Sequence, residues 1–190
     1  MNDKLTHIDH KGDANMVNIG NKKDVIRKAK ARGEIRLKTS TIDAIEKDSV
    51  VKGNVLSVAR MGAIDAVKHT WEIIPLCHQI KINGIEVEFL VEKDKVIMEV
   101  AVEAFGKTGC EMEALVGLST GLNTIWDMVK AIEKDKDGKY PTTSIGQIEI
   151  IEKVKKKVLF WLNILGKVLG QLVLQHKKIQ ERLHLKQIKI

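Results

Sequence analysis

Residues 80–102 read IKINGIEVEFLVEKDKVIMEVAV, and this stretch decides the fold. Apolar and polar side chains alternate from Ile80 to Phe89 and again from Val91 to Val102, around the charged group Lys93-Asp94-Lys95. Alternation with a period of two is typical of a strand with one buried face. The pattern therefore predicts two antiparallel strands joined by a charged turn.

Two segments with helical spacing flank this hairpin. Between Val51 and Ile74, apolar residues recur three or four positions apart until Pro75, through which a helix does not continue. The same spacing runs from Glu111 to Ile132. We therefore expect one long helix before the hairpin, ended by the proline, and a second long helix after it.

Shorter elements are expected around this centre. Met16–Ile19 and the residues near Ile35 favour short strands, and Thr39-Ser40-Thr41 supplies an N-cap for a short helix. Ile145–Ile151 indicates a last strand, whereas residues 1–15 have no periodicity and indicate a loose arm. The order of elements predicts an α+β sandwich with helices on one face of an antiparallel sheet.

The net charge of +7 on 190 residues is unevenly distributed. Residues 1–152 carry 22 Lys and Arg against 24 Asp and Glu, a balance of −2, whereas residues 153–190 carry 10 against 1, a balance of +9. Only 4% of the residues are aromatic, although a nucleic-acid binding module needs aromatic side chains among its basic ones. We therefore expect no nucleic-acid partner for the body.

The cysteines give a first indication of the compartment. The N-terminus lacks the apolar run of a secretory signal, so we expect a cytoplasmic protein in which Cys77 and Cys110 are free thiols. Neither belongs to a Cys-x-x-Cys pair, which argues against a structural zinc site. Gly106-Lys107-Thr108-Gly109 is not a phosphate-binding P-loop, because Ala101 stands where that motif needs glycine.

Five blocks of sequence carry the functional argument together, since each alone has an ordinary structural explanation such as a loop histidine or a surface ion pair. They are Met16-Val17-Asn18-Ile19, Lys52-Gly53-Asn54-Val55, Ile74-Pro75-Leu76-Cys77-His78, Gly106–Leu115 and Trp126-Asp127-Met128-Val129-Lys130-Ala131. In this order they resemble the signature blocks of the cyclic pyranopterin monophosphate synthases, also called the molybdenum cofactor biosynthesis protein C family. The resemblance spans residues 5–153, and we take residues 1–153 as the synthase domain and residues 154–190 as a C-terminal extension.

The resemblance implies a ferredoxin-like fold and a hexamer built from dimers. It implies a lyase that converts (8S)-3',8-cyclo-7,8-dihydroguanosine 5'-triphosphate to cyclic pyranopterin monophosphate and pyrophosphate, an early step of molybdenum cofactor biosynthesis. Asp127 would be the catalytic acid or base, and Lys52 and Lys130 would be active-site lysines. The residues that would contact substrate are Leu76, Cys77, His78, Met112 and Glu113, with Arg27 and Glu111 as neighbours.

Three departures from the family pattern stand out. Asn18 replaces a usual aspartate, and Gln79 follows His78 where proline is usual. Many members end in a Gly-Gly-Lys-Ser-Gly loop whose lysine enters the pocket, whereas this chain continues as Val154-Lys155-Lys156-Lys157. A pocket lysine from within Lys153–Lys157 is compatible with the sequence.

Several expectations about chemistry follow. Lysines as close together as Lys52 and Lys130 would be are expected to depress each other's pKa, and Asp127 beside a lysine could shuttle protons. Glu113 lies 14 residues before Asp127, roughly 21 Å along a helix, so one site needs both ends of the helix from two subunits. No redox cofactor and no resident metal are implied, although Mg²⁺ could accompany the triphosphate.

Two alternatives remain open. The first is a cyclohydrolase, which commonly holds a metal through Cys and His ligands, although Cys77-His78 lacks an evident partner set. The second concerns residues 154–190, where an amphipathic helix is expected over 158–175. This helix either packs on the body or a neighbouring subunit, or contacts an anionic membrane surface through its basic flanks, unless the extension lies outside the native reading frame.

Overall fold

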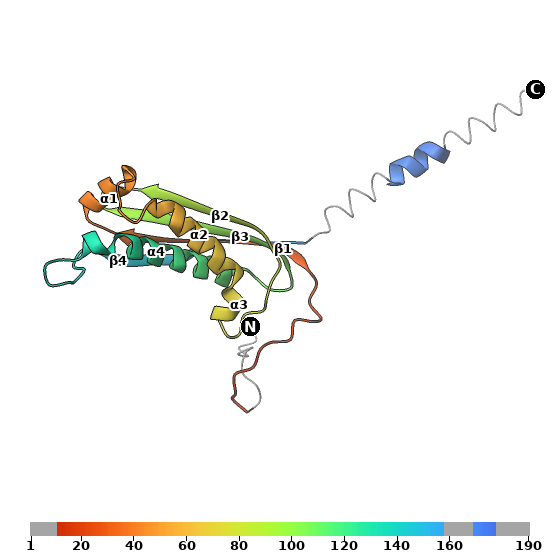
Figure 1. Cartoon of the computed structure of the whole chain (residues 1–190). Helices are drawn as coiled ribbons and strands as arrows, with labels where there is room; N and C mark the ends of the chain where they lie inside the picture. The colour runs from red at the N-terminus through yellow and green to blue at the C-terminus, as the bar shows by residue number, and fades with distance from the viewer. Residues whose placement is uncertain (1–10, 158–168, 178–190) are drawn as a thin grey trace, which may run out of the picture. The chain divides into compact units, whose positions relative to one another are not determined.

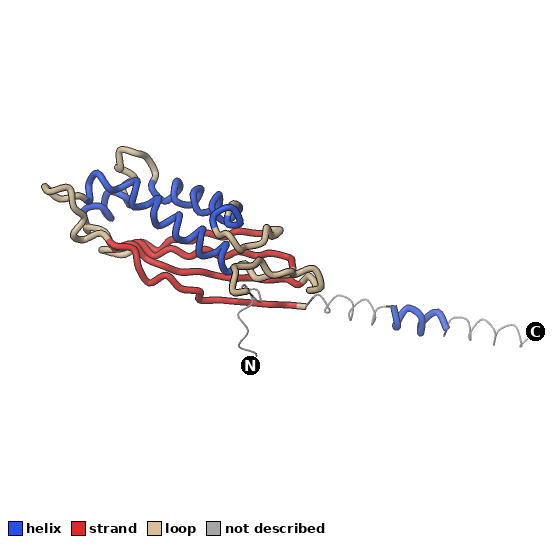
Figure 2. The backbone as a smooth tube through the Cα atoms, turned by 90° about the horizontal axis from the view of Figure 1, so that it is seen from below, coloured by secondary structure: helices blue, strands red, loops and turns tan. Residues whose placement is uncertain are grey.

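The structure, a computed structural model, describes residues 11–157 and 169–177. A four-stranded sheet with the order β2-β3-β1-β4 carries the helices on one face, so the expected α+β architecture is confirmed (Figures 1 and 2). The elements are β1 (Val25–Arg36), α1 (Thr39–Glu46), α2 (Val55–Lys68), α3 (Thr70–Ile73), β2 (Ile82–Val91), β3 (Lys95–Gly106), α4 (Glu111–Glu133) and β4 (Ser144–Lys156).

The predicted hairpin is confirmed as β2 and β3, which pair antiparallel up to Val91 and Val96. The Glu92 amide donates to the Lys95 carbonyl at 2.9 Å across the charged turn. The second long helix and the last strand are confirmed as α4 and β4. Strand β4 continues through the expected boundary between residues 153 and 154, and the compact body ends at Lys155.

Strand β1 is far longer than the short strand expected near Ile35. It pairs with β3 along its whole length, with Ala31 opposite Val100. Its buried residues include alanines, which have low strand propensity. In the sequence, only the alternation of these alanines with basic residues indicates a strand here. The short strand expected at Met16–Ile19 is wrong, because this segment is not paired into the sheet and Val17 and Ile19 line a pocket instead.

The single helix expected from Val51 to Ile74 is wrong at its start and in its continuity. Helix α2 begins at Val55, where the Asn54 side chain accepts a hydrogen bond from the Ser57 amide at 2.8 Å. It ends at Lys68, and a short helix α3 follows after His69. The buried Thr70 hydroxyl donates to the Ala66 and Val67 carbonyls, a type of back-bonding that bends helices.

The cap expected for α1 is also wrong. The helix starts at Thr39 with Lys38 in the N-cap position and has no side-chain cap of its own. Instead, the buried Glu133 at the end of α4 accepts the Lys38 amide at 3.1 Å and also binds the Thr143 hydroxyl. Glu133 thus ties α1 and the approach to β4 to the end of α4.

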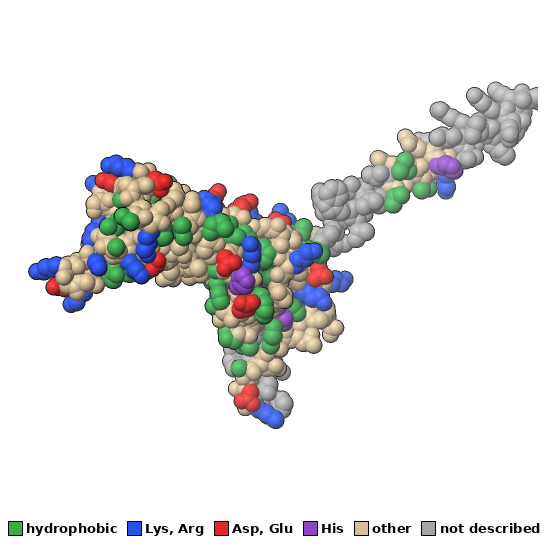
Figure 3. Space-filling model, viewed as in Figure 1, with side chains coloured by type: hydrophobic (Ala, Val, Ile, Leu, Met, Phe, Trp, Pro, Cys, Tyr) green, Lys and Arg blue, Asp and Glu red, His purple; other side chains and the backbone are tan. Residues whose placement is uncertain are grey.

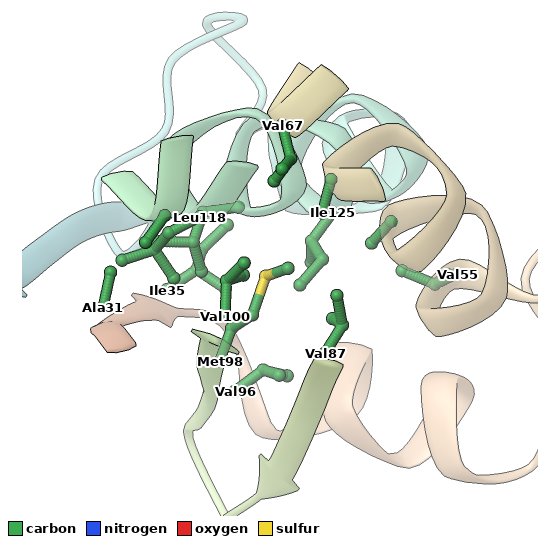
Figure 4. Close-up of a cluster of buried hydrophobic side chains, with 14 of the residues drawn as sticks. Ala31, Ile35, Val55, Val67, Val87, Val96, Met98, Val100, Leu118 and Ile125 are labelled. Atoms are coloured by element: carbon green, nitrogen blue, oxygen red, sulfur yellow. The ribbon is translucent and has the colours of Figure 1, made fainter. Parts of the chain in front are cut away.

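The core packs α4 against both the sheet and the neighbouring helix α2. Leu118 and Ile125 of α4 are fully buried against the sheet residues Val100 and Met98 (Figure 4), and burying each such side chain contributes roughly 1.5–3 kcal/mol. A Cβ on Gly117 would lie 2.5 Å from Val67 Cγ2 and 3.2 Å from the Ala63 carbonyl, so this glycine permits the close approach of α4 to α2. The middle of α4 is therefore closely packed against both the sheet and α2.

A second unit comprises residues 156–190. Within it, residues 169–177 are helical, and Leu169, Leu172, Val173 and Leu174 are each more than half exposed. The rest of the amphipathic helix expected over 158–175 lies outside the described residues. Within the described ranges, no helix is long and apolar enough to span a membrane.

Candidate active site

A pocket of about 380 Å³ opens at the start of α4. Apart from Arg27, all the substrate-contacting residues expected from the sequence line it. Sequence reasoning did not foresee Val17, Ile19, Lys22, Thr108 and Gly109 as pocket residues. The full lining is Val17, Ile19, Lys22, Leu76, Cys77, His78, Thr108, Gly109, Glu111, Met112 and Glu113.

Two junctions bring these residues together. Leu76, Cys77 and His78 lie between α3 and β2, where the Cys77 amide donates to the Ile74 carbonyl in a turn at 3.0 Å. Glu111 and Glu113 lie in the first turn of α4, where carboxylates are favoured by the helix dipole. A Cβ on Gly109 would lie 1.8 Å from a Glu111 carboxylate oxygen, so the glycine leaves that space to the carboxylate.

Glu113 is the most perturbed acid of the pocket. Its side chain is only 4% exposed, and burial raises its pKa to about 7, with a smaller contribution from the charge of Glu111. A carboxyl with this pKa exists in both forms at neutral pH and can therefore give or accept a proton. Burial, together with the charge of Glu113, also raises the pKa of the Cys77 thiol, which disfavours the reactive thiolate.

Glu111 lies in a different electrostatic setting two residues earlier. Burial acts to raise its pKa, but the Lys153 ammonium, 2.5 Å from Glu111 Oε1, together with a backbone hydrogen bond and the charge of Arg27, outweighs burial, and the pKa is lowered. Arg27 does not line the pocket. Its guanidinium donates to the Gly106 and Lys107 carbonyls at 3.3 and 3.1 Å, and its charge also favours the ionised form of Glu111. Arg27 thus binds the backbone just before α4 and does not face the pocket itself.

The three expected catalytic residues meet in a separate cluster near the end of α4. Lys52 Nζ lies 2.8 Å from Asp127 Oδ2 and 2.7 Å from the Asp127 carbonyl oxygen, while Lys130 Nζ lies 2.6 Å from Asp127 Oδ1. Lys52 lies in the turn before α2, outside the helix, although a helix was expected from Val51 onward. The cluster therefore combines Lys52 from the turn before α2 with two residues on one face of α4.

The carboxylate controls the charge of this cluster. Hydrogen bonds from Lys130 and then Lys52 lower the pKa of Asp127 to about 2. The same contact raises the pKa of Lys130. The expectation that the two lysines depress each other's pKa is therefore wrong for Lys130, because a carboxylate lies between the ammonium groups and favours their charged form. At neutral pH the cluster contains an ionised Asp127 and an ammonium at Lys130.

An aromatic pair borders this cluster and was not anticipated from the sequence. The rings of Trp126 and Tyr140 meet edge to face with centroids 5.6 Å apart, and Tyr140 also contributes to the raised pKa of Lys130. Tyr140 belongs to the loop between α4 and β4, which is held at its base by the bond between Thr143 and Glu133. The only advance signal was a tyrosine beside Pro141 in a turn-rich stretch.

Within one chain, the expected residues form two groups rather than one. Glu113 lines the pocket at the start of α4, and Asp127 lies 14 residues further along the same helix, which is roughly 21 Å at helical rise. Other hollows lie over the uncovered sheet face, where one of about 460 Å³ is lined by Arg32 and Glu99, which pair with each other at 3.0 Å. None of the expected site residues lines that hollow.

A family model for the MoaC family matches residues 16–156 of this chain. The chain belongs to the MoaC family. The matched range contains both groups of residues and ends at the last residue of β4. Residues 157–190 lie beyond it.

Relatives within the MoaC family match over nearly their whole length. The chain is 59% identical over 153 residues to a probable cyclic pyranopterin monophosphate synthase of Natronomonas pharaonis, a match that covers 80% of this chain and 96% of the relative. Proteins with the same description in Halobacterium salinarum and Pyrococcus furiosus are 58% and 50% identical, with 94% and 98% of their lengths covered.

Metal ligation was the feature expected of the rival cyclohydrolase. Among the described residues, no group of three or more His, Cys, Asp and Glu side chains is arranged to hold a metal ion. Cys77 and Cys110 are both free thiols, as expected. Cys110 is buried, and its Sγ donates to the Val102 carbonyl at 3.3 Å, which ties the start of α4 to β3.

Proposed function

We propose that this chain is a lyase that converts (8S)-3',8-cyclo-7,8-dihydroguanosine 5'-triphosphate to cyclic pyranopterin monophosphate and pyrophosphate, in molybdenum cofactor biosynthesis. The observation that carries the proposal is that relatives named for this synthase share 50–59% of their residues with the chain over a range containing both charged groups at the ends of α4. The fold we propose is ferredoxin-like, which the strand order β2-β3-β1-β4 supports.

The reaction needs proton transfers, positive charge for the departing pyrophosphate, and orientation of the nucleotide. Glu113, with a pKa of about 7, is suited to exchange protons inside the pocket. Lys52 and Lys130 supply positive charge, held in place by Asp127, which at neutral pH can act as a base or as an electrostatic anchor but not as an acid. Mg²⁺, if required, would arrive on the triphosphate of the substrate.

The active site would be completed by a second copy of the chain. One small substrate cannot contact residues roughly 21 Å apart, but an antiparallel pair of α4 helices related by a two-fold axis would bring the start of one beside the end of the other. Apolar side chains are available for such pairing: Met61, Trp71, Ile73 and Met112 are between 38% and 66% exposed. Figure 3 shows hydrophobic side chains gathered where Figure 1 places α3. We propose a dimer that assembles further into a hexamer.

Turnover of the cyclised nucleotide tests this proposal directly. The purified full chain should release pyrophosphate and form a fluorescent pterin after oxidation, and Asp127→Ala should not. A well-folded protein that forms no product would contradict the proposal. Metal analysis separates the cyclohydrolase alternative, which would require a stoichiometric bound metal.

We also propose a cytoplasmic enzyme, because the nucleotide of the proposed reaction is a soluble molecule. We propose no nucleic-acid partner, because residues 1–152 carry a net charge of −2. Retention on heparin should come from the basic residues beyond 153 and vanish when residues 154–190 are removed. Binding of DNA or RNA by the shortened chain would contradict this part of the proposal. The membrane-surface alternative for the tail predicts binding of the full chain to anionic vesicles.

A further inference from the structure

The pocket at the start of α4 poses an electrostatic problem for an anionic substrate. It is lined by two carboxyl groups, Glu111 and Glu113, and Glu111 is held ionised because its pKa is lowered. The substrate of the proposed function carries a triphosphate, which these groups would repel. Positive side chains close to Glu111 are therefore needed before a phosphate can approach this end of the site.

Lys153 meets this need from the last strand of the sheet. Its Nζ lies 2.5 Å from Glu111 Oε1, which places an ammonium group from β4 beside a carboxylate that lines the pocket. The Lys153 side chain is 66% exposed, whereas that of Glu111 is 25% exposed. An ammonium group has three N–H donors, and the bond to Glu111 uses one of them. The remaining donors can bind oxygens of a ligand at the mouth of the pocket.

The surroundings of Glu111 make this position well defined. The carboxylate occupies the space beside Gly109 that a Cβ would fill, and its residue begins the rigidly packed helix α4. Arg27, anchored on the Gly106 and Lys107 carbonyls, adds positive charge on the same side. Lys22 of the pocket lining supplies a further cation. The ion pair thus holds a long, flexible lysine beside a pocket residue, which reduces the entropy that Lys153 loses when it binds a ligand.

We propose that Lys153 binds phosphate oxygens of the nucleotide at the mouth of the pocket while its ion pair with Glu111 keeps it in place. This inference rests on the proposed function for the identity of the ligand, a nucleoside triphosphate derivative that leaves pyrophosphate. It assigns a substrate-binding role to a residue in β4, inside the range matched by the family model and just before Val154, where the chain departs from the family pattern.

Binding of inorganic pyrophosphate to the full chain tests the assignment by titration calorimetry. Lys153→Met should weaken binding about tenfold or more, because a charge-assisted hydrogen bond is lost, and Lys153→Arg should restore most of it. Lys155→Met removes the same charge from an exposed position about 7 Å further along the strand and should change binding less than about twofold. With the cyclised nucleotide, Lys153→Met should raise KM by about the same factor as the pyrophosphate Kd.

Three results would overturn the assignment: wild-type affinity in Lys153→Met, an equal loss in Lys155→Met, or no pyrophosphate binding by the wild type. Thermal unfolding of each variant serves as the folding control. The outcome is separable from the proposed function. If the wild type forms the pterin while Lys153→Met keeps its KM and its pyrophosphate affinity, only the role of Lys153 fails, whereas absence of product from the wild type contradicts the function itself.

Discussion

The two ends of α4 carry carboxyl groups with opposite acid–base behaviour. Glu113, in the first turn, is 4% exposed and has a pKa raised to about 7 by burial. Asp127, in the last third of the helix, is 58% exposed and has a pKa lowered to about 2 by Lys130 and Lys52. The same chemical group on one helix is thus tuned in opposite directions, by desolvation at one end and by paired ammonium groups at the other.

This contrast indicates different chemical roles for the two ends of α4. The pocket end can exchange protons near neutral pH, because Glu113 exists there in both forms. The other end keeps a fixed arrangement of charges, because Asp127 stays ionised and Lys130 stays protonated. Joined across two subunits, the ends would supply proton transfer and phosphate stabilisation to one substrate.

The largest effect is expected at the charged cluster. Asp127→Ala, Lys52→Ala and Lys130→Ala should each leave the fold intact, since these side chains are at least 42% exposed, yet lower turnover at least about a hundredfold. Steady-state release of pyrophosphate measures this. Asp65→Ala is the control, because Asp65 is also an exposed aspartate on a helix, with its Oδ1 3.5 Å from His69 Nδ1. Near-normal activity of Asp127→Ala would remove the cluster from the mechanism.

Mixing two inactive variants tests whether the ends meet across subunits. Glu113→Gln and Asp127→Ala, combined after subunit exchange, should regain about a quarter of wild-type activity, because half the dimers are mixed and each mixed dimer holds one intact site of two. Mass spectrometry of differently tagged chains would verify the exchange. Should the mixed dimers form without any activity, the two ends of α4 do not share a site in this way.

The raised pKa of Glu113 predicts an effect on stability. The folded protein holds this proton up to about pH 7, whereas the unfolded chain releases it near the ordinary value of 4.5. The native state therefore binds more protons in this interval, and the free energy of unfolding falls as pH rises through it, by on the order of 2 kcal/mol. Glu113→Gln should remove this loss in urea unfolding at pH 5 and pH 8.

The exposed Glu46→Gln on α1 is the control for that experiment and should keep the wild-type dependence. An unchanged dependence in Glu113→Gln would show that burial does not hold the proton of Glu113, and the contrast between the ends of α4 would be lost.

The smallest effect is expected for the tail. Deleting residues 158–190 should change turnover less than about twofold, because both ends of α4 and Lys153 lie in the body, which ends at Lys155. Turnover of the truncated chain, with its oligomeric state measured by light scattering, checks this. A truncated chain that folds and assembles but has lost activity would show that the tail contributes to the site.

Sequence patterns predicted the hairpin, α4 and β4 because periodicity in these segments is strong and local. They also indicated the pair of Asp127 and Lys130, since residues three apart share a helix face. The full length of β1 was missed because its buried alanines have low strand propensity and are stabilised by pairing with β3. The break between α2 and α3 depends on the hydrogen bonds of buried Thr70, which spacing does not reveal.

The residue types of the candidate site were thus determined by the sequence, and their arrangement was decided by the tertiary structure. Lys52 reaches Asp127 across 75 positions of sequence, and Lys153 reaches Glu111 across 42. Burial is the main cause that raises the pKa of Glu113 above that of an ordinary glutamate. Long-range contact and desolvation are properties of the packed molecule, because they depend on which segments the sheet and α4 bring together, whereas periodicity and helix-face pairing are already present in a short stretch of chain.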